Sequence, residues 1–492
     1  MERSAGILMP IFSLPSPYGI GTLGREAYAF VDFLAAAGQK YWQILPVGPT
    51  SFGDSPYQSP SAYAGNPYFI DLHLLIEEGL LTKAEVESFF WGSDPSQVDY
   101  HAMYQNRLEL LRIAAERGYE QAPVADFERE NSSWLPDYAL FMAIKRYFKD
   151  VSWLDWSEEA LRRRDAEALA EYREKLKEDI RLFTFVQYLF FRQWKSLREY
   201  AHEKGVMLIG DLPIYVALDS ADVWARPENF QLDENYMPVE VSGVPPDMFS
   251  ADGQLWGNPL YDYEKMAEKD YEWWVKRIEG ASRLYDVIRI DHFRGFESYW
   301  AVPYGETTAK SGRWRKGPGM ALVGLLKEKF PKLSFIAEDL GYPSPEVRAL
   351  LADSGFPGMK VLVFSFDTKD SDISKPHDYI ANSVCYAGTH DNDTLKGWLE
   401  HADSKDRKQA ALYFGLNRHE GYVRGMLRGG MASVPKLFIA QMQDYLKLGS
   451  EARMNTPGKL EGNWRWRLLP GQANERLAGR IRVMTERYGR GG

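Results

Sequence analysis

Four apolar runs in the sequence end on acidic residues: Asp211 in "LIGDLP", Asp291 in "IRIDHF", Glu338 in "FIAEDLG" and Asp391 in "AGTHDND". A single acid after a strand usually caps the next helix. Four such endings instead favour a shared site, because barrel enzymes carry their reactive groups at the carboxyl ends of the strands. Two facing carboxyls suit glycosidic-bond chemistry, in which a carboxylate attacks the anomeric carbon and a carboxylic acid protonates the leaving oxygen.

The surroundings of these acids predict different roles for them. Arg289 precedes Asp291 by two residues and shares its strand face, so we expect the guanidinium to lower the pKa of Asp291 and keep it ionised as the nucleophile. Glu338 follows the largely apolar "SFIA", which favours a raised pKa and the role of acid. Asp391 would be a third carboxylate that supports positive charge in the transition state. His390 is either a hydrogen-bond donor to a hydroxyl or a packed structural histidine.

Eight short apolar runs must position these residues. Helical patterns separate them, and their continuous rather than alternating hydrophobicity indicates strands that are buried on both faces, as in parallel sheets. The sequence therefore predicts an α/β fold, a (β/α)8 TIM barrel with largely helical subdomain insertions at the strand C-terminal ends. The runs span residues 6–15, 41–49, 206–216, 287–293, 334–341, 360–367, 383–393 and 436–446.

The spacing of the runs is uneven and predicts where the barrel is elaborated. We expect residues 1–492 to form a single catalytic barrel domain with two insertions, at about 65–200 after the second strand and about 218–280 after the third. Residues 242–263 are interpreted as an aromatic loop that shields the site from water. No separate starch-binding module is recognisable.

Composition excludes several classes of partner. The 59 basic and 69 acidic residues give a net charge of −10, which argues against nucleic acid and anionic membranes. Cys385 is the single cysteine, so no intramolecular disulfide can form and a reducing, cytoplasmic location is expected. No apolar run approaches the roughly 18 residues of a membrane span. Aromatic residues make up 14% of the chain, enough to serve both a core and stacking on sugar rings.

Longer motifs carry a family resemblance. The segments "GDLPIYV", "VIRIDHFRGF", "FIAEDLG" and "YAGTHDNDT" resemble, in this order, the four short regions of the α-amylase clan. Together with "GDSPYQSPSAYAGNPYFIDL", "VSGVPPDMFSADGQLWGNPLYDY" and "RMNTPGKLEGNWRWRL", they are similar to glycoside hydrolase family 77, the amylomaltase family. The first region lacks the Asn-His pair of typical amylases, an absence that the family shares and that removes a reason to expect structural calcium.

The resemblance implies a function. The family consists of 4-α-glucanotransferases, which move α-1,4-glucan segments between maltodextrins by a retaining double displacement and form cycloamyloses. It implies that Asp291 forms a covalent glucosyl intermediate, that Glu338 is the general acid/base and that Asp391 stabilises the transition state. The implied substrates are maltodextrin or starch-derived donors and acceptors. We expect no cofactor and no metal, and a monomer or homodimer.

The resemblance also implies substrate contacts. Residues that match positions around the sugar at the cleavage site are Arg289, His390 and Asp211. Other matched glucan contacts are Ser55, Tyr57, Trp256, Asn258 and Phe249, with His292 in a supporting or outer-subsite position.

Three alternatives stay open at this point. An α-1,4-glucan hydrolase of the amylase clan would share all three carboxylates and differ in its products. A non-catalytic glucan-binding protein would use the same aromatic residues. A metal-dependent barrel hydrolase could use His292, His390 and the acids, although no His-x-His pair is present.

Overall fold

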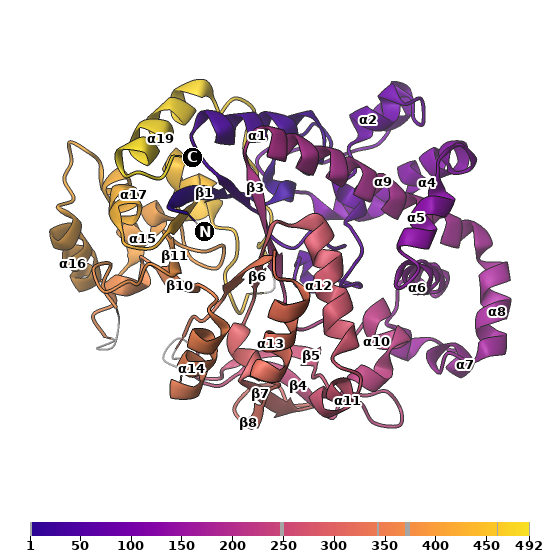
Figure 1. Ribbon diagram of the computed structural model, residues 1–492. Helices are drawn as coiled ribbons and strands as arrows, with labels where there is room; N and C mark the ends of the chain where they lie inside the picture. Colours follow the sequence, from indigo (N-terminus) through magenta and orange to yellow (C-terminus); the bar gives the residue numbers. More distant parts are fainter. Residues whose placement is uncertain (1, 247–249, 342–343, 370–373, 460, 492) are drawn as a thin grey trace.

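Eight short parallel strands form a closed barrel in the computed structural model (Figure 1). The structure describes residues 2–246, 250–341, 344–369, 374–459 and 461–491. The strands follow one another around the ring in chain order, so the predicted (β/α)8 barrel and all eight predicted strands are confirmed. They are β1 (Ser4–Leu8), β2 (Tyr41–Gln43), β3 (Met207–Leu212), β6 (Val287–Ile290), β9 (Ser334–Ala337), β10 (Gly358–Val361), β11 (Ser383–Tyr386) and β12 (Leu437–Gln441).

The barrel strands are buried on both faces, which explains their continuous hydrophobicity. All five residues of β12 are buried, as are all four of β6 and of β11. Side chains fill the barrel interior, and helices cover its outside. The α-helices before β2, β3, β6, β9 and β10 are α1 (Arg25–Ala36), α9 (Lys177–Glu203), α12 (Glu272–Leu284), α13 (Met320–Lys329) and α14 (Pro345–Ser354).

The last third of the barrel is less regular. Between β10 and β11, the described residues contain the 3-10 helix η8 (Phe364–Phe366) and no α-helix. Arg490 donates a hydrogen bond to the carbonyl of Ser4 at 3.0 Å, which ties the two ends of the chain together beneath the barrel. The remaining helices of this part are α15 (Leu395–His401), α16 (Ser404–Phe414), α17 (Tyr422–Ala432), α18 (Met442–Leu446) and α19 (Glu475–Arg487).

A long helical insertion separates β2 from β3 and extends to one side of the barrel (Figure 1). Several of its helices pack on α9, whose amphipathic pattern gives it a buried face along most of its length. In the described part of the chain, no helix is long and apolar enough to cross a bilayer. The insertion contains α2 (Leu72–Glu77), α3 (Lys83–Glu87), α4 (Tyr100–Gly118), α5 (Val124–Glu130), α6 (Leu135–Tyr147), α7 (Glu159–Arg162) and α8 (Ala166–Lys175).

A four-stranded antiparallel sheet is an addition that the sequence did not predict. Its order is β5-β4-β7-β8, with β4 (Glu240–Val244), β5 (Gln254–Pro259), β7 (Ser298–Pro303) and β8 (Arg313–Lys316). The interpretation of residues 242–263 as a loop is therefore wrong in part, because β4 and β5 pair across this segment. The insertion after β3 contains β4 and β5 as well as the helices α10 (Ala221–Ala225) and α11 (Tyr263–Glu268), so it is only partly helical. The other two strands of the sheet follow β6.

Candidate active site

A buried ion pair lies at the ends of two neighbouring strands. Asp211 on β3 is in register with Arg289 on β6, and Arg289 Nη1 lies 2.6 and 2.7 Å from the two carboxylate oxygens of Asp211. The same nitrogen lies 3.0 Å from Oδ1 of Asp291, which comes directly after β6. The side chains of Asp211 and Arg289 are almost wholly buried, whereas that of Asp291 is 27% exposed. Asp211 therefore holds Arg289 in place, and Arg289 in turn orients Asp291.

Glu338 comes directly after β9, the next strand of the barrel, and its carboxyl is held by the backbone. Its Oε2 accepts a hydrogen bond from the N–H of His292 at 2.7 Å, and its Oε1 accepts one from the N–H of Leu340 at 2.9 Å. The carbonyl of Glu338 accepts from the N–H of Phe293 at 3.0 Å. These contacts fix the turn after β6 to the end of β9, and so fix Glu338 relative to Asp291.

His292 adopts the left-handed conformation, with φ 49° and ψ 48°. This is rare for a residue with a side chain, and it ends β6 at Ile290. The turn aims the N–H of His292 at Glu338 and places its imidazole edge-to-face against Trp256, with the ring centroids 4.7 Å apart. Burial lowers the pKa of His292 to about 3, with a smaller contribution from Arg294, so its imidazole is neutral.

The pKa of Asp291 differs from the prediction. Burial raises the pKa of Asp291 to about 8; the carboxylates of Asp211, Glu338 and Asp391 add to this rise, and Arg289 opposes it. The predicted lowering was wrong because burial of the Asp291 carboxyl outweighs the opposing charge of Arg289, which Asp291 shares with Asp211. Burial also raises the pKa of Glu338, as predicted. Burial therefore favours the protonated form of both carboxyls, and the charge of Glu338 adds to the rise for Asp291.

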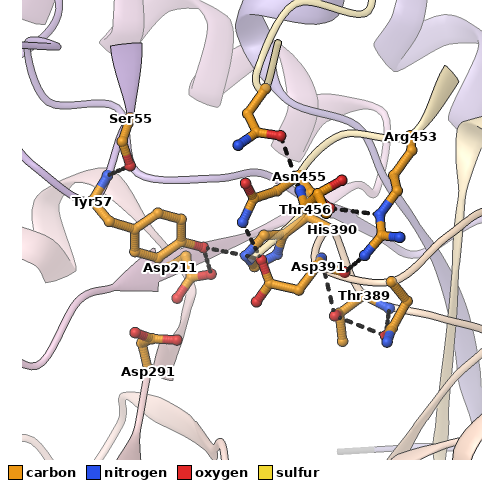
Figure 2. Close-up of polar contacts among 12 residues, drawn as sticks. Ser55, Tyr57, Asp211, Asp291, Thr389, His390, Asp391, Arg453, Asn455 and Thr456 are labelled. Carbon is orange, nitrogen blue, oxygen red and sulfur yellow. Dashed lines mark hydrogen bonds and ion pairs between the residues drawn. The ribbon is translucent and has the colours of Figure 1, made fainter. Parts of the chain in front are cut away.

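Asp391 follows β11 and is anchored by a segment beyond β12, as Figure 2 shows. Its Oδ1 accepts a hydrogen bond from Nδ2 of Asn455 at 2.6 Å. Its backbone carbonyl accepts from Nη2 of Arg453 at 2.6 Å, and its N–H donates to Thr389 Oγ1 at 3.3 Å. The side chain remains 44% exposed, so it is held in place and still open to a ligand.

Tyr57 connects two parts of the site (Figure 2). Its hydroxyl lies 2.9 Å from Asp211 Oδ2 and 2.8 Å from Nε2 of His390. A carboxylate only accepts, so the hydroxyl donates its single proton to Asp211, and His390 Nε2 donates to the hydroxyl. The ring of Tyr57 is stacked on that of His390, with the centroids 5.4 Å apart. Burial lowers the pKa of His390, which keeps it a neutral donor.

The other predicted ligand contacts differ in where they lie: some border the site, and one is buried behind it. Ser55 accepts a hydrogen bond from the N–H of Tyr57 at 3.2 Å, and Trp256 lies on β5 beside His292. Asn258 is buried: its amide nitrogen donates to the carbonyl of Val216 at 3.0 Å, and its oxygen accepts from Ser242 at 3.3 Å. These contacts point to a role for Asn258 in supporting the site. Phe249 lies outside the described residues.

Arg453 and Asn455 were not singled out from the sequence. They lie in the irregular segment after α18, where no strand or helix pattern places a side chain. The motif "RMNTPGKLEGNWRWRL" contains both residues and was the available signal. Across the described residues, no cluster of three or more His, Cys, Asp or Glu side chains has the arrangement of a metal site.

Changing Asn455 to alanine tests the anchoring of Asp391. The loss of this charge-assisted hydrogen bond is expected to lower kcat/KM by roughly 10- to 100-fold. The fold should be unaffected, because Asn455 is part of an irregular segment. Steady-state kinetics alongside a thermal melt measure both effects. An unchanged kcat/KM would mean that Asp391 needs no such support.

Comparisons with known proteins identify the family and the fold. The glycoside hydrolase family 77 model, described as 4-alpha-glucanotransferase, matches residues 9–472. The 4-alpha-glucanotransferase of Clostridium butyricum is 49% identical over 98% of this chain and 100% of its own. That of Thermus thermophilus is 45% identical over 99% of both chains.

Solved structures show the same fold. The amylomaltase of Streptococcus agalactiae, solved in complex with acarbose, superposes with a TM-score of 0.97 at 44% identity and covers all of both chains. The amylomaltase of Corynebacterium glutamicum, at 20% identity, shares the fold with a TM-score of 0.78 over 98% of this chain and 75% of its own. The chain therefore belongs to glycoside hydrolase family 77, the 4-α-glucanotransferase family.

Proposed function

We propose that this enzyme transfers α-1,4-glucan segments between maltodextrins with retention of configuration, through a covalent glucosyl intermediate on Asp291. The observation that carries the proposal is the pairing of Asp291 and Glu338 at the ends of the adjacent strands β6 and β9, with one buried guanidinium beside Asp291. We further propose that residues 1–492 act as one catalytic unit in the cytoplasm, which suits the free, buried Cys385.

In the first step, Asp291 attacks the anomeric carbon of the donor and Glu338 protonates the departing 4-oxygen. The positive charge that develops on the sugar favours the ionised form of Asp291, and the raised pKa of Glu338 keeps the transferable proton on that carboxyl. Asp391, held by Asn455, adds negative charge beside the sugar. The Asp211–Arg289 pair keeps the nucleophile in position while the new bond forms.

In the second step, Glu338 removes the proton from the 4-hydroxyl of an incoming glucan, which attacks the intermediate and releases Asp291. Tyr57 and His390, which hydrogen-bond to each other, form one polar side of the site, and the rings of Trp256 and His292 form an aromatic side suited to an acceptor ring. Transfer exceeds hydrolysis when such contacts bind the acceptor and reduce access by water. Attack by the far end of the same chain would give a cycloamylose.

Maltotriose separates the proposed transfer from hydrolysis. We expect incubation to yield glucose together with maltodextrins longer than the substrate, while the total number of reducing ends stays constant, because each transfer makes one glycosidic bond for each one broken. Chromatography of the products and a reducing-sugar assay measure the two quantities. A steady rise in reducing ends without longer products would identify a hydrolase, and no reaction with any maltodextrin would favour a glucan-binding protein.

A further inference from the structure

A second cavity is lined by residues of α6, α10, α11 and the start of α12, helices that are labelled in Figure 1. Its volume is about 250 Å³, larger than the roughly 60 Å³ cavity that adjoins Asp211 and Tyr57. Ser61 and Tyr63 line both cavities, so the two are neighbours separated by the chain segment that follows Tyr57. None of the roles described above uses the larger cavity.

Aromatic rings form part of the wall of this cavity. Tyr63 and Trp134 are nearly parallel, with an interplanar angle of 11° and centroids 6.0 Å apart, and Trp273 contributes a third ring. The indole nitrogen of Trp134 donates to Asn131 at 3.2 Å, which fixes the orientation of its ring. Fixed, partly exposed rings are suited to packing against the apolar faces of a sugar.

A buried carboxylate supplies a hydrogen-bond acceptor in the same cavity. Asp222 is only 7% exposed, its Oδ2 accepts from the N–H of Ala62 at 2.8 Å, and no cation of the described chain lies within ion-pair distance of it. The hydroxyl of Tyr63, in the same wall, has no hydrogen-bond partner among the described residues. A ligand that brings hydroxyl groups would satisfy both.

The charged side chains of the lining do not favour an anion. Four acids and three bases line the cavity, and Asp137 is already paired with Arg164, as Lys276 is with Glu272. Among the described residues, the remaining bases Arg226 and Lys269 have no ion pair, and the acids Asp222 and Glu228 balance them. The acids are Asp137, Asp222, Glu228 and Glu272, and the bases are Arg226, Lys269 and Lys276. Balanced charge, donors, acceptors and aromatic rings together fit a neutral polyhydroxyl ligand.

We propose that this cavity is an auxiliary binding site for a neutral α-1,4-glucan segment. The identity of the glucan rests on the proposed function, because the same chains would then be present at the neighbouring catalytic site. A chain long enough to occupy both sites binds more tightly than a short one, since binding at one site raises its effective concentration at the other. The auxiliary site therefore favours long glucans over maltotriose.

Filling the cavity tests the proposal. Ala225 on α10 lines it, and Ala225→Trp would occupy it with an indole ring. Ala267 on α11 is exposed and does not line it, so Ala267→Trp is the matched control for an added surface tryptophan. Both changes are made in the Glu338→Gln background, which slows turnover, and affinity for amylose is measured by electrophoresis in amylose gels. A thermal melt verifies the fold of each variant.

Ala225→Trp is expected to raise the dissociation constant for amylose about fivefold relative to Ala267→Trp. The added indole would block the stacking and hydrogen bonds that a glucan makes in the cavity. In the active enzyme it should lower kcat/KM for amylose more than that for maltotriose.

Asp222→Asn keeps an acceptor for the N–H of Ala62 and should also weaken amylose binding. This variant preserves the test if Ala225→Trp does not fold. Equal amylose affinity for Ala225→Trp, Asp222→Asn and the control would overturn the auxiliary site. Failure of the proposed function would instead appear as a wild-type enzyme that transfers neither maltotriose nor amylose, whatever the gels show.

Discussion

Asp291→Asn is expected to lower kcat for maltotriose disproportionation by at least about 10⁴-fold, the size of effect seen when a nucleophile is removed from a covalent mechanism. Asparagine has nearly the same shape as aspartate, so the contact with Arg289 can be kept while the attacking oxygen is lost. KM should change little by comparison. Initial rates over a range of maltotriose concentrations separate the two parameters.

Asp339→Asn is the matched control for Asp291→Asn. Asp339 is the other acid at the end of β9, and it accepts a hydrogen bond from the N–H of Met359 at 2.7 Å, which asparagine can also accept. Burial raises the pKa of Asp339, so the loss of its charge is tolerated. We expect this variant to keep activity within about tenfold of the wild type. A similar residual activity for both variants would contradict a special role for Asp291.

Glu338→Gln is expected to lower kcat by about 10²- to 10⁴-fold with maltodextrin donors, which need protonation of the leaving oxygen. It should also change the pH profile. In the wild type, activity is expected to fall on the acid side as Asp291 becomes protonated and on the alkaline side as Glu338 loses its proton, and the raised pKa of each carboxyl moves its limb to higher pH. Without the Glu338 charge, the pKa of Asp291 falls, so the acid limb moves to lower pH and the alkaline limb disappears.

The control for Glu338→Gln is a donor that needs no acid. With an α-maltosyl fluoride, the leaving fluoride departs without protonation, so the first step should proceed at close to the wild-type rate. The second step still requires a base and should remain slow. Equal losses on maltotriose and on the fluoride would show that Glu338 acts on binding or folding rather than as the proton donor.

The sequence predicted the barrel because its strands are buried on both faces and read as apolar runs. The acids at their ends were found for the same reason, since each lies where apolar residues stop. The antiparallel sheet was missed in part because Gly243 and Gly257 interrupt β4 and β5, and because all four residues of β8 are exposed. Such strands have no hydrophobic alternation to detect.

The fine structure of the site depends on contacts between distant segments, which local patterns do not record. Asn455 reaches Asp391 over a separation of 64 residues, and the N–H of His292 reaches Glu338 over 46. Burial of Asp291 reversed its predicted pKa shift, and the neighbouring carboxylate of Asp211, which shares Arg289, added to the rise. A sequence can show that a guanidinium lies near a carboxylate, but not how many carboxylates share it.

The most direct test of the mechanism is to trap the proposed intermediate. Glu338→Gln is mixed with an α-maltosyl fluoride, quenched in acid, digested with pepsin and analysed by mass spectrometry. The account predicts a maltosyl adduct on a peptide that contains Asp291, and its absence when Asp291→Asn is added to the same background. An adduct on any other residue, or unmodified enzyme despite release of fluoride, would contradict the assignment of Asp291 as the nucleophile.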